Sequence, residues 1–420
     1  MNRLQSIRGF SDIQENIDLW QTIERILKKT AFQYGYDEIR TPLLEDSRLF
    51  ERSIGATSDI VHKEMYTFQD KNEQSISLRP EGTASVVRAC IENNLLYDQA
   101  RKFFYIGSMF RRERPQKGRL RQFNQFGMEA LGYQEPYADI EQLLAIHRIW
   151  KTLGVEKKIA LEMNYIGTSK TRKLYKEKLK AYYKPYLCSM SEIDKKRWEE
   201  NTLRLLDSKD KEIITINQEA PSIDEFYSDD EKLIFEEIQR NCRENGITFK
   251  VNHRLMRGLD YYCGLIYEWK SDELGAQSTV CGGGRYDGLF EDLGDKVQGA
   301  CGYSIGIERL LEIVKSGSIQ ATKKKSVHIL VPDKKTLSNA VKLAEEIREK
   351  SPNISCYTHV ENGKLGQLIK KALKKQASAV IICGEREVAE NKYTLKILET
   401  QEQLQLTTSE MINKIGETCD

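Results

Sequence analysis

Long apolar runs are absent from this sequence. No stretch approaches the ~18 apolar residues that a membrane-spanning helix requires, and residues 1–13 lack the apolar segment of a secretory signal. The nine cysteines are scattered and form no CxxC pair. Neither a zinc site nor a disulfide framework is therefore expected. These absences predict a cytoplasmic protein without membrane contact.

Histidine is rare, and the common nucleotide-binding motifs are missing. The sequence has no GxxxxGKS/T loop, no GxGxxG following a strand and no HExxH motif. A P-loop, a dinucleotide fold and a zincin-type site are thus disfavoured. The histidines lie in unrelated contexts, which gives little support to a histidine triad or a histidine metal site. They are His62, His147, His253, His328 and His359.

Charge is balanced overall but uneven along the chain. The 420 residues include 65 Lys and Arg against 63 Asp and Glu, a net charge of +2. Residues 111–121 hold six basic residues and one acid, 170–184 hold seven and one, and 364–375 hold five lysines and no acid. Lysine-rich helices are usually solvated faces. The arginine cluster at 111–121 is less ordinary, because arginine forks suit phosphate groups.

Apolar spacing predicts an α+β domain over residues 1–323, a fold in which strands and long helices do not alternate regularly. Residues 166–245 are rich in Lys, Glu and Asp and are expected to form a helical insertion. Helices are predicted at 17–33, 83–93, 138–153 and 306–315. Strands are predicted at 36–40, 75–79, 103–110 and 121–131, and in the glycine-rich stretch that follows residue 251.

A polar stretch at 315–326 predicts a linker to a second domain, residues 324–420. The pattern there is strand, helix, strand, helix, strand, which is typical of a mostly parallel α/β domain. The strands are expected at 327–332, 354–360 and 378–383, and the helices at 336–350 and 364–375.

Four clusters carry an unusual density of reactive side chains: LRPEGT (78–83), FRRERPQKGRLRQFNQFGMEALG (110–132), RGLDYY (257–262) and GYSIGIERL (302–310). Taken singly, three have ordinary structural explanations: a turn, a strand with packing tyrosines, and a surface ion pair of Arg309. The second predicts a basic hairpin. At a period of two, its second strand places Arg121, Phe123, Gln125, Gly127 and Glu129 on one face.

The prediction for the hairpin is that Gln125 and Glu129 point into one pocket while Arg111 and Arg121 serve a phosphate chain. The glycines at 282–284 do not sit at a strand-to-helix turn. We therefore interpret them as a place of close backbone approach or tight turning, not as a phosphate cradle.

Together, in this order and spacing, the four clusters resemble the histidyl-tRNA synthetase family of class II aminoacyl-tRNA synthetases. Three segments resemble the three class II motifs: residues 34–44, which include Pro42, the hairpin FRRERPQKGRLRQF, and GYSIGIERL. RGLDYY and GGGRYDGL are similar to the two sequences that distinguish the histidine enzymes. The resemblance covers nearly the whole chain and is weakest in the insertion.

The resemblance implies a catalytic core with an antiparallel sheet that binds a bent ATP. Arg111 and Arg257 would be the catalytic residues, on opposite sides of the α-phosphate. Glu113 would contact the adenine, and Arg119 and Arg309 would hold the β- and γ-phosphates.

The family also implies a site for histidine. Glu81, Thr83 and Gln125, with Gly82 between the first two, would bind the α-amino group, while Glu129 and Tyr262 would read the imidazole nitrogens. Tyr261 and Tyr286 would line the pocket, and Arg111 and Arg257 would also face this substrate.

The implied reaction joins L-histidine to ATP and then transfers histidine to the 3′ end of tRNA(His), with Mg²⁺ accompanying ATP and no zinc. When the histidine carboxylate attacks the α-phosphorus, charge builds on the equatorial oxygens. Positioned arginines and Mg²⁺ stabilise that charge without covalent help from the protein. By resemblance, residues 324–420 bind the anticodon stem-loop, and the core forms a homodimer through the segment around Pro42.

Some positions depart from the family pattern: Asn124 stands where histidine is usual, Cys263-Gly264 where Asn-Arg is frequent, and Gln14 where proline is common. Two alternatives stay open. One is the regulatory subunit of ATP phosphoribosyltransferase, which shares the fold but usually lacks the second domain and loses the site residues. The other is an RNA-binding protein with an inactive site.

Overall fold

The chain forms two compact units, Met1–Ile319 and Gln320–Asp420. The computed structural model describes residues 3–55, 58, 60–116, 118–134, 136–208, 210–275, 278–315, 325–360 and 364–419. Most of the predicted linker, 315–326, lies outside the described residues. Each unit has a sheet of its own.

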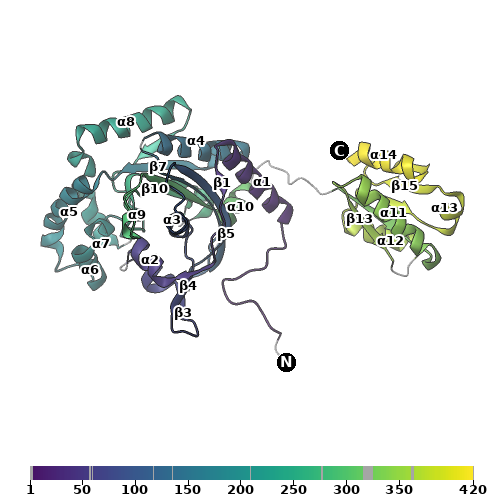
Figure 1. Ribbon diagram of the computed structural model, residues 1–420, viewed down its shortest axis with the longest axis horizontal. Helices are drawn as coiled ribbons and strands as arrows, with labels where there is room; N and C mark the ends of the chain where they lie inside the picture. The colour runs from purple at the N-terminus through teal and green to yellow at the C-terminus, as the bar shows by residue number, and fades with distance from the viewer. Residues whose placement is uncertain are drawn as a thin grey trace. The chain divides into compact units, whose positions relative to one another are not determined.

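An eight-stranded sheet is the centre of the described part of the first unit, with strand order β1-β5-β6-β11-β10-β9-β7-β8 (Figure 1). From β5 to β7 all neighbours pair antiparallel, whereas the edge strands β1 and β8 pair parallel with β5 and β7. The predicted antiparallel core is confirmed, with a short parallel strand added at each edge. The strands are β1 (Asp37–Glu38), β5 (Arg101–Phe110), β6 (Gln122–Leu131), β7 (Ala160–Tyr165), β8 (Phe249–Val251), β9 (Cys263–Lys270), β10 (Thr279–Arg285) and β11 (Ala300–Gly306).

The predicted basic hairpin is formed by β5 and β6, which pair without a break from Arg101↔Leu131 to Phe110↔Gln122. The alternation on β6 also holds. Phe126 packs against Tyr303 of β11 at 6.3 Å between ring centroids, while Glu129 accepts a hydrogen bond from Thr83. Polar residues on one face and buried apolar residues on the other give the sheet a site side and a core side.

Three helices pack together over the core side of the sheet: α1 (Ile17–Gln33), α4 (Tyr137–Thr152) and α10 (Ile307–Lys315). In α1 the buried residues include Leu19, Ile23 and Leu27, which recur at four-residue spacing along one stripe. Helix α1 has the predicted bounds, and Gly35 at φ +75° lies just beyond it, where a left-handed residue ends a helix at no steric cost.

Helix α3 (Thr83–Glu92) contacts β6 and the shorter helix α2 (Ser47–Ile54). Beside them lies a three-stranded antiparallel sheet, β2 (Leu44–Asp46), β4 (Ser75–Leu78) and β3 (Tyr66–Gln69). A π-helical turn at Ile60–Glu64 and the short helix α9 (Leu289–Asp292) complete this part. The LRPEGT segment therefore runs from the end of β4 into the first turn of α3.

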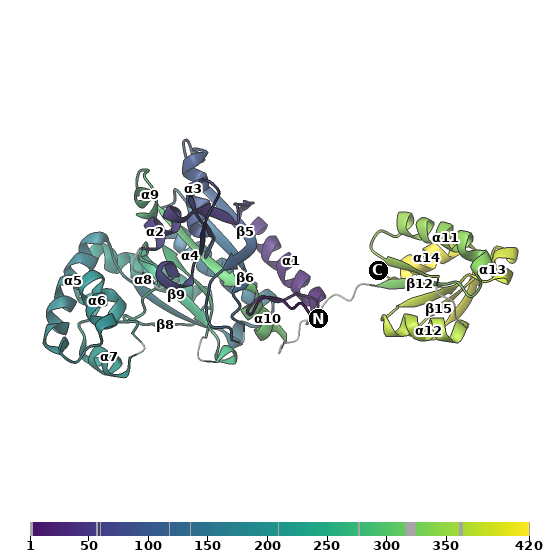
Figure 2. The same ribbon diagram turned by 90° about the horizontal axis from the view of Figure 1, so that it is seen from below.

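The segment 166–245 is helical and gathers on one side of the first unit (Figures 1 and 2). The charged, glycine-poor sequence suits helices, and two of them begin at serine caps. Ser191 caps α6, and Ser228 forms a reciprocal capping box with Glu231 in α8. The helices are α5 (Ser169–Tyr183), α6 (Glu192–Glu200), α7 (Lys211–Ile216) and α8 (Asp229–Glu244), with a 3-10 turn at Thr202–Leu205.

The described part of the second unit has a five-stranded sheet with strand order β13-β12-β14-β15-β16. The α/β organisation is confirmed, and the three predicted strands, β12, β13 and β14, are parallel to one another as predicted. Two further strands were not predicted, and their pairings, β14-β15 and β15-β16, are antiparallel. The connection from β14 to β15 holds only the six-residue helix α13 and turns at the left-handed residue Asn391, which is too short for a parallel crossover.

The elements of the second unit surround a core of their own, which includes Val327, Leu343, Ile381 and Met411. The strands are β12 (Ser326–Leu330), β13 (Ser355–His359), β14 (Ala379–Ile382), β15 (Tyr393–Ile397) and β16 (Gln403–Leu406). The helices are α11 (Leu337–Lys350), α12 (Leu365–Lys374), α13 (Glu385–Glu390) and α14 (Thr408–Cys419). In neither unit does a described helix have the length and apolar character needed to cross a bilayer.

One strand assignment needs correction. RGLDYY was expected to belong to a strand, but residues 257–262 form a loop, and β9 begins only at Cys263. Side-chain partners hold the loop: Arg257 pairs with Glu268, and Asp260 pairs with Arg204. We call residues 257–262 the RGLDYY loop.

Candidate active site

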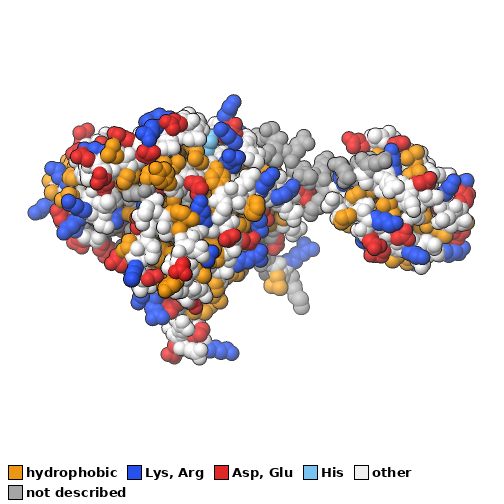
Figure 3. Space-filling model, turned by 45° about the horizontal axis from the view of Figure 1, so that its top comes forward, with side chains coloured by type: hydrophobic (Ala, Val, Ile, Leu, Met, Phe, Trp, Pro, Cys, Tyr) orange, Lys and Arg blue, Asp and Glu red, His pale blue; other side chains and the backbone are white. Residues whose placement is uncertain are grey.

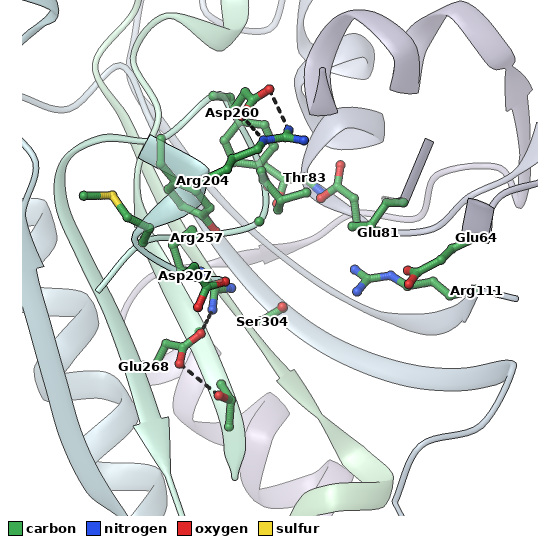
Figure 4. A pocket seen from close by; sticks show the side chains of 18 of the residues that line it. Glu64, Glu81, Thr83, Arg111, Arg204, Asp207, Arg257, Asp260, Glu268 and Ser304 are labelled. Atoms are coloured by element: carbon green, nitrogen blue, oxygen red, sulfur yellow. Dashed lines mark hydrogen bonds and ion pairs between the residues drawn. The ribbon is translucent and has the colours of Figure 1, made fainter. Parts of the chain in front are cut away.

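A cavity of about 790 Å³ opens on the site side of the first unit, a volume in the range of small-molecule sites. It is lined by the hairpin, the RGLDYY loop, β10, β11, the start of α10 and the insertion. Arg111 and Arg257 both line it, and Figure 4 shows Arg111, Arg257 and Glu81 around the same space. The sheet thus brings together arginines that are far apart in the sequence.

Arg111 follows the last residue of β5. Its Nε donates to the carbonyl oxygen of Pro80 at 2.9 Å, and its guanidinium lies 5.5 Å from the centre of the Phe123 ring. The backbone just before Glu81 and a ring on the opposite strand therefore fix its direction. A guanidinium held in this way keeps N–H groups for an anion in the cavity.

Arg257 is held at the other wall. Its Nη1 donates to Glu268 of β9, and its guanidinium lies 5.6 Å from the centre of the Tyr262 ring. Thr279 donates to the second oxygen of Glu268 at 3.0 Å. A Cβ at Gly282 would overlap the guanidinium, so this glycine allows the close backbone approach that the sequence predicted.

The carboxylate of Glu81 is turned back onto its own chain. It accepts the N–H groups of Thr83 at 2.9 Å and of Ala84 at 2.7 Å, in the first turn of α3. Its pKa is raised by burial, although these N–H groups and Arg111 act in the opposite direction. Gly82 must be small here, because a Cβ would overlap the ring of Tyr105.

Glu129 lies beneath the cavity floor. Oε1 accepts the Thr83 hydroxyl at 2.7 Å, and Oε2 accepts the hydroxyl of Tyr286. Burial raises the pKa of Glu129 to about 8, despite these two hydrogen bonds, and the charge of Glu81 adds to the rise. Glu129 and Tyr286 do not themselves line the cavity, whereas Thr83 and Gly302 do.

Aromatic and amide groups surround the same end of the cavity. Tyr261 and Tyr262 line it with ring centroids 4.7 Å apart, and Tyr286 lies 5.6 Å from Tyr261. Gln125 also lines it, and its buried Oε1 has no hydrogen-bond partner among the described residues. A buried acceptor without a partner is costly unless a ligand supplies the donor.

The other end of the cavity is basic. Arg119 pairs with Glu113 at 2.8 Å, and Arg309 at the start of α10 donates to the carbonyl of Thr279. Burial, followed by the charge of Arg119, lowers the pKa of Arg309 to about 10. Next to Arg309, Glu308 accepts the backbone and side-chain N–H groups of Asn124 at 2.9 and 3.0 Å. Such crowded positive charge favours an anionic ligand.

The structure also shows what the sequence did not reveal. Arg121 was expected to serve a phosphate chain, but it does not line the cavity. It packs against Gly9 and donates to the carbonyl oxygens of Glu113 and Arg8. The insertion, in contrast, contributes Arg172, Lys176 and Arg204 to the lining. The basic run 170–184 was the available signal, but nothing in the sequence connected it with this cavity.

Metal ligands do not cluster in the described part of the chain: no group of three or more His, Cys, Asp and Glu side chains could hold an ion there. The lining of the cavity includes arginine, carboxylate and aromatic side chains.

In the first unit, Arg111 follows strand β5 of the basic hairpin, Arg309 lies at the start of α10, and both line one cavity of an antiparallel sheet. This is the fold and site of a class II aminoacyl-tRNA synthetase. The model of the family described as histidyl-tRNA synthetase matches residues 10–310, and that of the anticodon binding domain matches residues 325–418. The chain belongs to the histidyl-tRNA synthetase family. It is an aminoacyl-tRNA ligase that joins L-histidine to tRNA(His) at the expense of ATP.

Solved structures agree with this membership. Apo histidyl-tRNA synthetase from S. aureus is 30% identical with a TM-score of 0.83, over 98% of this chain and 99% of that one. Histidyl-tRNA synthetase from Nostoc sp. PCC 7120 is 18% identical with a TM-score of 0.70, over 100% of both chains. A Bacillus halodurans protein described as an ATP phosphoribosyltransferase regulatory subunit/histidyl-tRNA synthetase is 20% identical with a TM-score of 0.65, over 91% and 99%. The last two show the fold alone.

Proposed function

We propose that histidine activation takes place in the described cavity, with Arg111 and Arg257 on opposite sides of the α-phosphate of ATP. The observation that carries this assignment is that both guanidinium groups line one cavity, each held by its own partners. Two anions must approach each other in this reaction, and fixed positive groups reduce their repulsion.

The basic end of the cavity suits the rest of the nucleotide. Arg119 and Arg309 would hold the β- and γ-phosphates, and Glu113 would accept from the adenine amino group. ATP enters as its Mg²⁺ complex, and this ion supplies further charge neutralisation on the phosphates. The lowered pKa of Arg309 supports this assignment, since a phosphate would relieve the repulsion from Arg119.

The aromatic end suits histidine. Glu81, Thr83 and Gln125 would bind its α-ammonium group, and the orphaned Oε1 of Gln125 supports this role. Glu129 and Tyr262 would face the imidazole ring, with Tyr261 and Tyr286 around it. Thr83 and Tyr286 each donate to one oxygen of Glu129, and a carboxylate has about four acceptor sites, so each oxygen would keep a lone pair for an imidazole N–H.

The chemistry then needs orientation more than proton transfer. A carboxylate oxygen of histidine attacks the α-phosphorus, the bond to the bridging oxygen of the β-phosphate breaks, and pyrophosphate leaves with the electron pair. In the second step a hydroxyl at the tRNA 3′ end attacks the carbonyl carbon and passes its proton to the phosphate group, the bond from that carbon to the phosphate oxygen breaks, and AMP leaves with the electron pair. Arg111 and Arg257 would stabilise charge on the oxygens of the α-phosphate in both steps.

Transfer requires tRNA, and the second unit would bind its anticodon stem-loop. Lysines of α12 support this role, although Figure 3 shows basic and acidic side chains interspersed on the visible face. Binding should weaken with salt, as contacts to phosphates do. We further propose that the protein acts in the cytoplasm as a homodimer.

Histidine-dependent exchange of pyrophosphate into ATP tests the assignment. Arg257→Ala should lower this exchange by about 10²–10³-fold, the usual cost of losing a group that stabilises transition-state charge. Its histidine affinity should stay within a few fold. Arg254→Ala is the matched control, because Arg254 is exposed and donates to Gln218 of the insertion. Full exchange in Arg257→Ala would refute the assignment.

A further inference from the structure

We infer that two arginines of the insertion, Arg204 and Arg172, are positioning residues for the reaction. They fix the RGLDYY loop so that Arg257 faces the cavity. The inference rests on the proposed role of Arg257, and it gives the insertion a task in amino-acid activation itself.

Arg204 forms the first of the two attachments. Its Nη2 donates to Oδ2 of Asp260 at 2.8 Å and its Nε to Oδ1 at 3.3 Å, a two-pronged contact (Figure 4). Asn201 donates to the same Oδ1 at 2.9 Å. The exposed fractions of the side chains are 17% for Arg204 and 31% for Asp260. A fork of this kind fixes orientation as well as distance.

Arg172 forms the second attachment, from the first turn of α5. Its Nη1 donates to the carbonyl oxygen of Tyr262 at 2.8 Å. The RGLDYY loop is therefore held near its middle and at its end by two different helical segments of the insertion. Arg172 and Arg204 both line the cavity as well.

The C-terminal end of helix α2 also contacts the RGLDYY loop, at Asp260. The N–H of Asp260 reaches the carbonyl oxygen of Ile54 at 3.4 Å, a long hydrogen bond. Gly55, at φ +94°, lies so close that a Cβ there would overlap the Asp260 carboxylate. Asp260 is thus the point where α2, the RGLDYY loop and the insertion meet.

These contacts matter because the loop is not part of the sheet. Arg257 lies three residues before Asp260, and Tyr261 and Tyr262 directly follow Asp260. A small shift of the loop would move Arg257 relative to the reacting phosphorus, and misplacement by about 1 Å can cost 10²-fold in rate. Losing the Arg204 fork should therefore lower turnover more than histidine binding.

The test compares four full-length variants, Arg204→Ala, Arg204→Lys, Asp260→Asn and the double variant Arg204→Ala/Asp260→Asn. Histidine-dependent ATP–pyrophosphate exchange gives kcat and the KM for histidine. We expect Arg204→Ala to lower kcat at least tenfold with KM within threefold, and Arg204→Lys to recover part of the loss. The double variant should be no slower than the slower single variant, because both changes break one contact.

Arg240→Ala on α8 is the matched control. Arg240 is exposed and pairs with Glu237 within the insertion, and its loss should leave kcat and KM unchanged. Thermal melting of every variant separates positioning from folding, and Arg204→Lys, which keeps the charge, remains informative if Arg204→Ala unfolds. Wild-type kcat in Arg204→Ala, or losses that multiply in the double variant, would overturn the inference.

Arg257→Ala, assayed in parallel, separates the two levels of the argument. If it keeps full exchange, the proposed role of Arg257 fails, and the inference fails with it. If it loses exchange while Arg204→Ala does not, only the inference fails.

Discussion

The hydroxyl of Thr83 donates to Oε1 of Glu129 at 2.7 Å, and this bond joins the first turn of α3 to the C-terminal part of β6. Tyr286 holds the other oxygen from beyond β10. Both partners are neutral hydroxyl groups, and the carboxylate of Glu81 raises the pKa of Glu129 further, beyond the effect of burial. The contribution of this carboxyl group to the stability of the fold is therefore expected to depend on pH.

Replacing Glu129 by Gln should change how stability depends on pH. The pKa of Glu129 is about 8 in the folded chain and about 4.3 in an unfolded one. Between these values the folded state holds more protons, so the free energy of unfolding of the wild type falls as pH rises. Glutamine does not titrate. The stability of Glu129→Gln relative to the wild type should therefore increase by up to about 1.4 kcal/mol per pH unit.

Urea unfolding at pH 5.5, 6.5 and 7.5 measures this difference. Glu236→Gln provides the control, because it makes the same change of residue type at an exposed position on α8. A difference between Glu129→Gln and the wild type that stays constant from pH 5.5 to 7.5 would show that Glu129 does not titrate in this window.

Gly302 should be a second sensitive position of the proposed histidine site. A Cβ there would overlap the Glu129 carboxylate and lie 2.9 Å from the Tyr286 hydroxyl, tighter than real contacts. Gly302→Ala should therefore push Glu129 or the cavity wall aside and raise the KM for histidine at least tenfold. The KM for ATP, at the other end of the cavity, should change less than threefold.

Gly288→Ala is the control for this change, since a Cβ at Gly288 meets nothing within 4 Å. Steady-state ATP–pyrophosphate exchange for both variants gives the two KM values. Equal histidine KM values for Gly302→Ala and Gly288→Ala would mean that Glu129 and Gly302 do not shape the proposed histidine site.

Local pattern was enough to predict much of the fold. The four-residue spacing in α1 and the two-residue alternation on β6 report which face each element buries, and both follow from helix and strand geometry. Local pattern did not predict the conformation of segments that are held by partners distant in sequence. The RGLDYY loop reads as a strand, yet Arg204 and Glu268 hold its side chains outside the sheet.

The same limit applies to the site. Arg111 and Arg257 could be named from motifs, and the sheet brings them to one cavity. Arg121 shares a predicted face with Gln125, but it precedes β6, where the strand period no longer applies, and it turns to the carbonyl of Arg8. Arg172 and Arg204 line the cavity because the insertion folds back onto the RGLDYY loop, and no local pattern in the sequence predicts this tertiary contact.

The second unit should lose stability in mild acid through His328. Its Nδ1 lies 2.9 Å from Nε2 of His359, so one ring donates and the other accepts, and both rings are buried. Burial, followed by the charges of His359 and Lys375, lowers the pKa of His328 to about 4. An unfolded histidine has a pKa of about 6.5. The stability that this difference provides is therefore present above pH 6.5 and is lost as pH falls toward 4.

Hydrogen exchange of the amides in β12 at pH 7 and pH 5, corrected for intrinsic rates, measures this loss of protection. In His328→Gln, the free energy of opening measured at the β12 amides should depend less on pH, by up to about 1.4 kcal/mol per pH unit between pH 7 and pH 5. His253→Gln, in the first unit, should leave the exchange of β12 unchanged. Unaltered protection between pH 7 and pH 5 in the wild type would contradict the prediction.

Removal of residues 324–420 should separate the two steps of the reaction. The residues that line the cavity all belong to the first unit, and the second unit has a separate apolar core. The shortened chain should therefore keep histidine-dependent ATP–pyrophosphate exchange within about threefold of the full chain. Without the unit that would bind the anticodon stem-loop, kcat/KM for tRNA(His) should fall at least a hundredfold at physiological salt.

Salt dependence adds a control to this experiment. Contacts with tRNA phosphates make binding weaken as salt rises, and fewer contacts give a smaller slope. The KM for tRNA(His) should therefore depend less steeply on salt in the shortened chain, while the KM for histidine should be equally insensitive in both. Undiminished charging of tRNA(His), with an unchanged salt slope, would mean that the second unit does not bind the anticodon stem-loop.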